Sequence, residues 1–181
     1  MLKLAGFVVL AALSVGTNKP EDHDEKATLL MCLSEKADPT VEQACSSVIM
    51  RIGADPDAVL SAYAARASVR MQLEDTHGAV ADCYLVDQKV KEKQGDGRGS
   101  FCFGYIYLLQ GRNELAISFM NRALLVDPGN ALYWYIRGVL YESAGLNEVA
   151  LLNYRRAVQS WPGDTQALDA ISRLDEAAKS R

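Results

Sequence analysis

The chain has 181 residues, of which 49% are hydrophobic and 23% are charged, and its formal net charge is −4. This length is sufficient for one domain with a sizeable core. The mild acidity and the lack of a long Lys/Arg run exclude binding to nucleic-acid phosphates as the main activity, because that function requires a clustered basic face.

Residues 1–16 have the pattern of a secretory signal peptide. Lys3 supplies the positive start, residues 4–13 form the apolar stretch, and Ser14 and Gly16 are small residues that favour cleavage after Gly16. The apolar run is shorter than the roughly 18–20 residues needed to span a bilayer. We therefore expect a cleaved signal and export, with an uncleaved anchor or a buried helix as the alternatives.

Residues 17–26 are polar, acidic and without periodicity, which predicts a flexible segment. Residues 27–56 predict a cysteine-bearing helical hairpin, whose first helix covers residues 27–36. Asp38 and Pro39 are typical of the N-cap and first turn of a second helix, which reaches about residue 52. The apolar residues of this second helix recur at spacings of three and four along one amphipathic face; they are Val41, Ala44, Cys45, Val48, Ile49 and Ile52.

A 34-residue period organises the following part of the chain. One set of residues is repeated 34 positions later: Gly104, Tyr107, Gly111, Ala116, Ala123 and Pro128 recur as Gly138, Tyr141, Gly145, Ala150, Ala157 and Pro162. Gly111 and Gly145 each follow the last apolar residue of a helix, where a left-handed backbone is common. Gly138 and Ala150 are small, so two antiparallel helices can approach closely there, and Trp134 and the tyrosines fill the wider levels.

This spacing resembles the tetratricopeptide repeat (TPR), a helix–turn–helix unit with the pattern W-x2-L-G-x2-Y…A-x3-F…P. Arg137 departs from the pattern, which has Leu there. The resemblance implies an all-α, right-handed solenoid closed by a capping helix. The three repeats and the cap are expected over residues 58–96, 97–130, 131–164 and 165–181. The first repeat is weaker, since Arg70 stands where Tyr141 does, and an insertion of three residues lies in the link over 91–99.

The resemblance also gives the four cysteines expected positions. Aligned with the repeat, Cys32 and Cys45 take the places of two facing tyrosines of the last repeat, so we expect a Cys32–Cys45 disulfide. Cys83 and Cys102 would lie on neighbouring helices, where they form a second disulfide or pack as small buried hydrophobic residues. Disulfides persist outside the cytosol. Paired cysteines behind a signal peptide resemble those of small exported bacterial TPR proteins, which implies a bacterial periplasm.

No pattern in the sequence indicates catalysis, a cofactor or a bound metal. His23 and His77 belong to separate elements, and neither has Cys, Asp or Glu residues at metal-ligand spacing around it. No P-loop, nucleophile elbow or GxGxxG occurs. The sequence therefore predicts a protein that is not an enzyme.

The stretch FCFGYIYLL, residues 101–109, is apolar on nearly all sides. Phe103 and Tyr107 belong to the core stripe, and a second apolar stripe lies on another face. In TPR proteins that face of each first helix lines a concave groove that binds a peptide or a partner helix. The expected groove residues are Phe101, Tyr105, Leu108, Leu109, Leu132, Tyr135 and Val139. The alternative is that the N-terminal hairpin or the capping helix covers this surface.

An apolar, aromatic lining favours an amphipathic helix or an extended apolar peptide as the partner. It disfavours the acidic C-terminal carboxylate that TPR co-chaperones grip with Lys, Asn and Arg. We interpret the chain as a non-catalytic protein–protein interaction module, an adaptor or assembly factor of the cell envelope, with no role in nucleic-acid binding. The alternative is a constitutive structural subunit of an envelope or membrane-associated complex.

Overall fold

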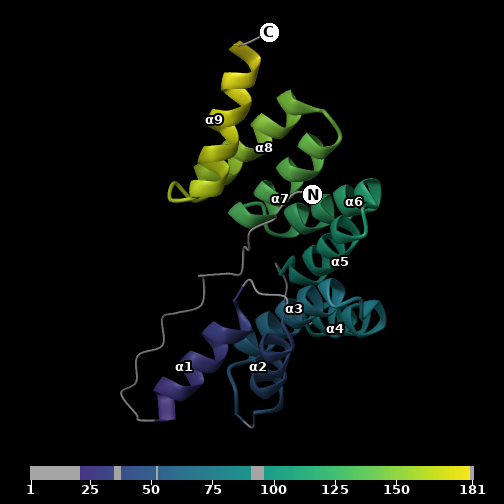
Figure 1. Ribbon diagram of the computed structural model, residues 1–181, viewed down its shortest axis with the longest axis vertical. Coiled ribbons are helices and arrows are strands. Elements are labelled where there is room, and N and C mark those ends of the chain that lie inside the picture. The colour runs from purple at the N-terminus through teal and green to yellow at the C-terminus, as the bar shows by residue number, and fades with distance from the viewer. Residues whose placement is uncertain (1–20, 35–37, 52, 91–95, 180–181) are drawn as a thin grey trace. The chain divides into compact units, whose positions relative to one another are not determined.

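The structure is a computed structural model that describes residues 21–34, 38–51, 53–90 and 96–179 (Figure 1). Every regular element in these ranges is an α-helix, which confirms the predicted all-α class. The chain divides into two compact units, residues 1–92 and 93–181. The expected signal peptide over 1–16 lies outside the described residues. Within the described ranges, no helix combines the length and the hydropathy needed to cross a membrane.

The first unit consists of two helical hairpins. Its helices are α1 (Glu21–Cys32), α2 (Pro39–Met50), α3 (Pro56–Gln72) and α4 (Thr76–Val90). α1 packs on α2 and α3 on α4, and α2 joins the two hairpins by packing on α3. Asp38 caps α2 as predicted, since its Oδ1 accepts a hydrogen bond from the Thr40 N–H at 2.6 Å. Asp55 caps α3 in the same way, accepting from the Ala58 N–H at 3.0 Å.

The first helix begins earlier than the sequence predicts. A flexible segment was expected over 17–26 and a helix over 27–36, but α1 runs from Glu21 to Cys32. Asp24, one of the acidic residues of that segment, lies near the start of α1, where negative charge interacts favourably with the helix dipole. The Thr28 hydroxyl also donates to the Asp24 carbonyl at 2.8 Å. At the other end of the hairpin, α2 stops at Met50, two residues before the predicted end.

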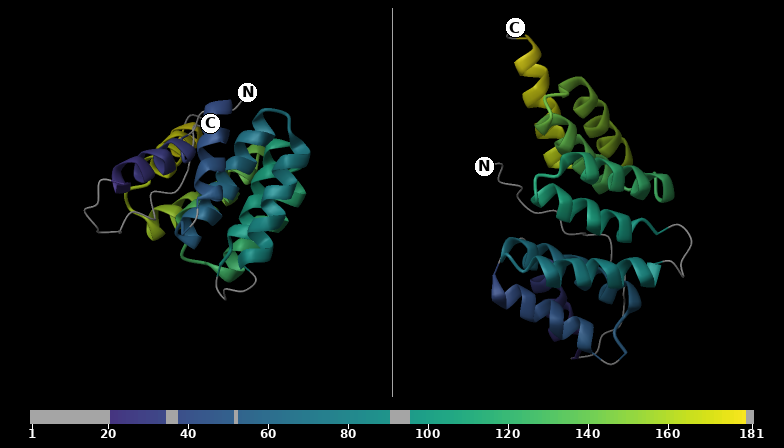
Figure 2. Two further views of the ribbon diagram at one scale, coloured as in Figure 1. Left: turned by 90° about the horizontal axis from the view of Figure 1, so that it is seen from below. Right: turned by 90° about the vertical axis from the view of Figure 1, so that its right-hand side faces the viewer.

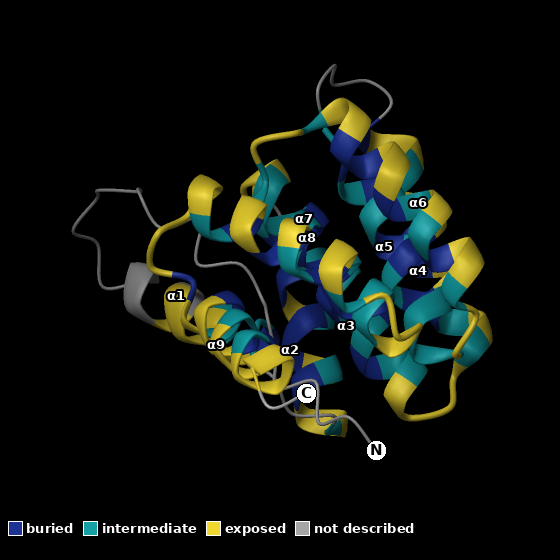
Figure 3. Cartoon of the chain, turned by 90° about the horizontal axis from the view of Figure 1, so that it is seen from above, coloured by how far each residue is buried: buried dark blue, intermediate teal, exposed yellow. Residues whose placement is uncertain are grey.

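The second unit contains two further hairpins and a final helix. Its helices are α5 (Arg98–Leu109), α6 (Asn113–Val126), α7 (Ala131–Ser143), α8 (Asn147–Ser160) and α9 (Thr165–Lys179). α5 packs on α6, α6 on α7, α7 on α8 and α8 on α9, so each helix covers the next along the chain. This succession runs from teal to yellow in Figure 2. The buried residues of each helix form the stripe that faces its neighbours (Figure 3).

The turns between paired helices confirm the predicted glycine positions. Gly111 and Gly145 have φ of 70° and 76°, in the left-handed region. The residue after each glycine donates its N–H to a carbonyl five residues earlier, at 2.9 Å in both turns. Glu74 occupies the corresponding place between α3 and α4 with φ of 67°, and the next N–H reaches the Arg70 carbonyl at 2.8 Å. The α3–α4 turn therefore has the same geometry without the glycine.

The predicted close approach of paired helices is also present. A Cβ atom on Gly138 would lie 2.6 Å from the Tyr154 ring, and one on Gly104 would lie 2.7 Å from the end of the Met120 side chain. Tyr154 and Met120 are both buried. The glycines therefore make room for large side chains of the facing helix, as close packing requires.

Trp134 is less buried than the repeat pattern suggests. Its side chain is only partly covered, and its indole N–H donates to the Pro128 carbonyl at 2.8 Å. The Arg137 guanidinium lies over the indole ring, 4.6 Å from the ring centre. Trp134 thus links the turn before α7 to the helix surface, while Tyr133, Ile136 and Leu140 supply the buried stripe of α7.

Candidate partner-binding surface

The seven predicted groove residues lie on α5 and α7 of the second unit, and they differ in accessibility. Leu132 and Val139 are 9% and 5% exposed, so they belong to the interior and are poorly placed to contact a partner. The other five are partly exposed: Phe101, Tyr105, Leu108, Leu109 and Tyr135. Their helical spacing gathers the four residues of α5 on one side of that helix. The candidate surface is therefore these five residues.

Aromatic contacts hold this surface in place. The Phe101 ring stacks on Tyr105 at 6.0 Å between ring centres and on Tyr133 at 5.0 Å. Tyr133 is buried, and burial raises the pKa of its phenol well above the usual range. On α7, the Tyr135 ring lies 5.6 Å from the buried Tyr154 ring. Phe101 and Tyr135 thus rest on buried tyrosine rings, and Tyr105 stacks on Phe101, so the surface is ordered before a partner arrives.

A polar contact connects the capping helix to the same side of α7. Arg173 of α9 pairs with both carboxylate oxygens of Glu142, and the Glu142 Oε2 also accepts from the Tyr154 hydroxyl at 2.8 Å. The hydrogen bonds from Arg173 chiefly lower the pKa of Glu142, against an opposing effect of burial. Burial and the adjacent carboxylate raise the pKa of Tyr154 well above its usual range. Glu142 is therefore ionised and fixed at the edge of the candidate surface.

Asp164 is a buried carboxylate at the start of α9. Its Oδ1 accepts from the Ala167 N–H at 3.0 Å and so caps the helix, while its Oδ2 has no hydrogen-bond partner. Burial raises the pKa of this carboxyl. Asp164 also lies close enough to Tyr135 to raise the pKa of that phenol, after the larger effect of burial and together with Glu142. Two carboxylates therefore lie near the Tyr135 phenol, and the Arg173 guanidinium opposes their effect on its pKa.

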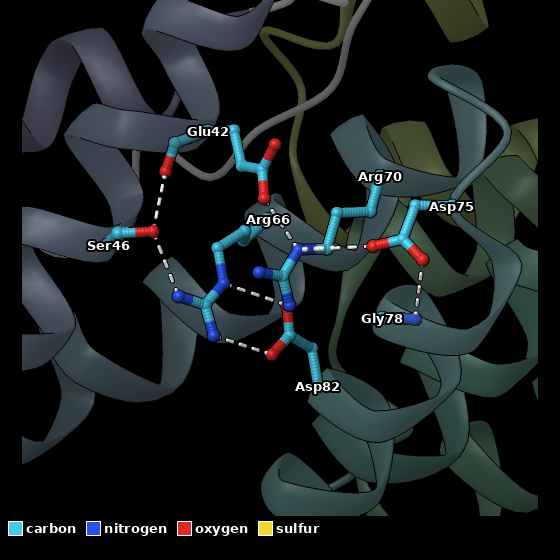
Figure 4. Close-up of polar contacts among 7 residues, drawn as sticks. All are labelled: Glu42, Ser46, Arg66, Arg70, Asp75, Gly78 and Asp82. Carbon is cyan, nitrogen blue, oxygen red and sulfur yellow. Dashed lines mark hydrogen bonds and ion pairs between the residues drawn. The ribbon is translucent and has the colours of Figure 1, made fainter.

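A second polar arrangement, which the sequence analysis missed, lies in the first unit (Figure 4). Arg66 donates to both oxygens of Asp82 and to the Ser46 hydroxyl, at 2.9, 2.7 and 2.9 Å. Arg70 donates to Asp82 at 3.0 Å and to Glu42 at 2.8 Å. These residues come from α2, α3 and α4. Because both guanidinium groups are engaged by carboxylates, this ion cluster fastens the three helices together.

The sequence contained a signal for this cluster. Arg66 and Asp82 are 16 residues apart, as are Arg137 and Asn153 in the last repeat. In that repeat the Arg137 Nε–H donates to the buried Asn153 carbonyl oxygen at 2.7 Å. Arg137, the departure from the repeat pattern, is thus explained by its partner on α8.

The four cysteines are all oxidised. Cys32 and Cys45 form a disulfide with 4.6 Å between their Cα atoms, and both are fully buried. Cys83 and Cys102 are also disulfide-bonded, so no cysteine is a free thiol. In the described ranges, no three His, Cys, Asp or Glu side chains are grouped so that they could hold a metal ion.

The comparisons with known proteins agree with this architecture. Residues 103–130 match the family described as Tetratricopeptide repeat. A crystal structure of MamA is similar to this chain with a TM-score of 0.55 at 16% identity, covering 91% of this chain and 87% of that one. A second crystal structure of MamA protein gives a TM-score of 0.53 at 17% identity, covering 88% and 78%. No curated protein matches the sequence of this chain. The chain thus contains a tetratricopeptide repeat within an all-α solenoid fold.

Proposed function

We propose that the chain is a non-catalytic protein–protein interaction module that binds an apolar peptide or an amphipathic helix through α5 and α7. The observation that carries the proposal is the aromatic surface of Phe101, Tyr105 and Tyr135. All three side chains are partly exposed; Phe101 and Tyr135 rest on buried tyrosines, and Tyr105 stacks on Phe101. Tyrosine and phenylalanine supply large contact areas and dominate many interfaces. Because the rings are already ordered, binding loses little conformational entropy.

The proposed setting is the cell envelope, where the protein acts as an adaptor or assembly factor. Oxidised cysteines support an oxidising compartment, since cytosolic thiols are kept reduced. The signal-like pattern of residues 1–16 supports export. An alternative is a constitutive subunit whose surface is always filled by a neighbour. An adaptor purifies as a soluble monomer on a sizing column, whereas a constitutive subunit aggregates or co-purifies in a fixed ratio with its neighbour.

A photo-crosslinking amino acid tests which surface meets a partner inside the cell. It would replace Tyr105 in one variant and Leu152 in a control variant. Leu152 is an apolar residue on α8 that is 63% exposed, so it measures non-specific capture. The proposal expects one defined protein adduct from position 105, identified by mass spectrometry, and none from position 152. Equal adducts at both positions, or none at position 105, would contradict it.

A further inference from the structure

The capping helix extends the candidate surface by one more helix. The buried residues of α9 are Ala167, Ala170 and Leu174. They lie 34 positions after the buried residues Tyr133, Ile136 and Leu140 of α7. The two helices therefore bury corresponding sides. By the same 34-residue shift, positions 166, 169, 173 and 176 of α9 correspond to positions 132, 135, 139 and 142 of α7. The ion pair between Arg173 and Glu142 connects these two sets of positions directly.

The face of α9 that carries Asp169, Arg173 and Glu176 is acidic once the ion pair between Arg173 and Glu142 of α7 is taken into account. Arg173 is neutralised by Glu142 of α7. Asp169 and Glu176 lie one turn to either side of Arg173 on the same face of the helix, and both are exposed. They add two negative charges to the face of α9 from which Arg173 reaches Glu142 of α7. Exposed carboxylates at the rim of an apolar patch select partners by charge.

A buried group adds to the same field. Asp164 is fully buried, and one of its carboxylate oxygens has no hydrogen-bond partner. It lies near Tyr135, whose phenol also senses the carboxylate of Glu142 and, in the opposite direction, the guanidinium of Arg173. Because Glu142 is paired with Arg173, a cation close to Tyr135 would interact chiefly with the carboxyl of Asp164 and with the faces of the tyrosine rings. An anionic segment would meet like charge at the same place.

We propose that the segment recognised by this chain is a basic amphipathic helix. Its apolar side lies on Phe101, Tyr105 and Tyr135, and its Lys or Arg side chains face Asp169 and Glu176. This inference rests on the function proposed above and specifies the chemistry of the partner. It accounts for a surface that is aromatic on α5, mixed on α7 and acidic on α9.

The test uses the full chain with its disulfides intact and three labelled synthetic peptides of about 18 residues, five helical turns. The peptides share one apolar face of leucines and differ on the polar face, which carries Lys, Gln or Glu. Fluorescence anisotropy gives the affinity of each. The proposal expects the Lys peptide to bind about three- to tenfold more tightly than the Gln peptide, and the Glu peptide to bind most weakly, since exposed ion pairs contribute modestly. Added salt should reduce these differences.

Two charge variants locate the effect on α9. The double substitution Asp169→Asn and Glu176→Gln should remove most of the preference for the Lys peptide. The control Glu114→Gln and Glu148→Gln removes two exposed carboxylates from α6 and α8 and should leave the preference intact. The two variants change the net charge equally, so a difference between them cannot come from overall charge.

The possible failures are distinguishable. Equal affinities for the three peptides, with all of them weakened by Tyr105→Ala, would overturn the basic partner and leave the proposed function standing. A preference lost equally in both charge variants would also overturn it, because the effect would then not belong to α9. Absence of binding by every peptide would contradict the proposed surface itself.

Discussion

Arg66 donates two hydrogen bonds to the carboxylate of Asp82, from Nε at 2.9 Å and from one terminal nitrogen at 2.7 Å. Asp82 is 1% exposed, so this is a buried charge that depends on its partners. Arg70 adds a third hydrogen bond and reaches Glu42 of α2. The cluster thereby ties the disulfide-bearing hairpin to the first repeat. A buried ion pair adds little to the free energy of unfolding compared with an apolar contact, but removal of one partner lowers that free energy strongly.

Removal of the buried carboxylate should therefore destabilise the first unit strongly. Asp82→Ala leaves two guanidinium groups without their shared partner, and we expect a loss of about 3 kcal/mol in the free energy of unfolding. Asp82→Asn should cost less, because Asn153 shows that an amide at this position accepts a hydrogen bond from the arginine. Urea unfolding of both variants checks the order. Equal losses would mean that packing, and not the ion pair, determines the stability at this site.

The close approach of α7 and α8 at Gly138 predicts how strongly three glycine variants lose stability. In Gly138→Ala the new methyl group would lie 2.6 Å from the buried Tyr154 ring, which is held by Glu142; we expect a loss of about 1–3 kcal/mol. In Gly104→Ala the nearest atom is the end of a flexible Met120 side chain, so the loss should be smaller. Gly129→Ala, whose closest atom is 3.8 Å away, is the control. Thermal unfolding should rank the three variants in that order, and a Gly129→Ala variant as unstable as Gly138→Ala would refute the packing argument.

Glu74 should be replaceable by glycine with a gain in stability. Its φ of 67° is the left-handed conformation that Gly111 and Gly145 adopt in the equivalent turns. A side chain in that region costs about 1–2 kcal/mol, partly offset by the greater flexibility of glycine in the unfolded chain. We expect Glu74→Gly to raise the free energy of unfolding by about 0.5–1 kcal/mol. The reverse change, Gly145→Ala, should lower it, and chemical denaturation measures both. A destabilised Glu74→Gly would show that the glutamate side chain contributes more than its backbone costs.

Much of the fold could be predicted because the repeat pattern depends on local interactions. Glycines at turns, prolines after second helices and the 34-residue period all act within one hairpin. Features that depend on contacts between helices were predicted less well. Leu132 and Val139 looked like groove residues from their positions on α7, but neighbouring helices bury them. The start of α1 was missed because a charged run has no apolar periodicity. The ion pair that joins Arg173 of α9 to Glu142 of α7 was missed because it depends on how two helices pack.

The buried cap of α9 predicts a pH-dependent variant. Burial raises the pKa of Asp164 in the folded state. Above that pKa the buried carboxyl is ionised and lowers the free energy of unfolding. This destabilisation disappears as the pH falls through the folded-state pKa. Asp164→Asn should keep the cap, as Asn130 does for α7 by accepting from the Leu132 N–H at 3.2 Å. We expect the variant to melt at a higher temperature than the parent at pH 7, with the difference shrinking in acid.

Two features isolate this effect from other titrating groups. Glu142 has a lowered pKa, so its contribution to stability is present at neutral pH and lost in acid, but equally in parent and variant. Asp55→Asn makes the same change at an exposed cap and is the control for the substitution itself. Melting curves of the three proteins across the acid range check the prediction. A constant difference between Asp164→Asn and the parent would show that the carboxyl is not the source.

The measurement that tests the central proposal most directly is the affinity of Tyr105→Ala for the Lys peptide, taken with its free energy of unfolding. The account predicts that binding weakens by about 1–3 kcal/mol, as for other interface aromatic residues, while the fold keeps most of its stability. Leu152→Ala, which removes an exposed apolar side chain from α8, should leave the affinity unchanged. A Tyr105→Ala protein that loses its stability but binds the peptide normally while folded would show that Tyr105 serves the core and would contradict the proposed surface.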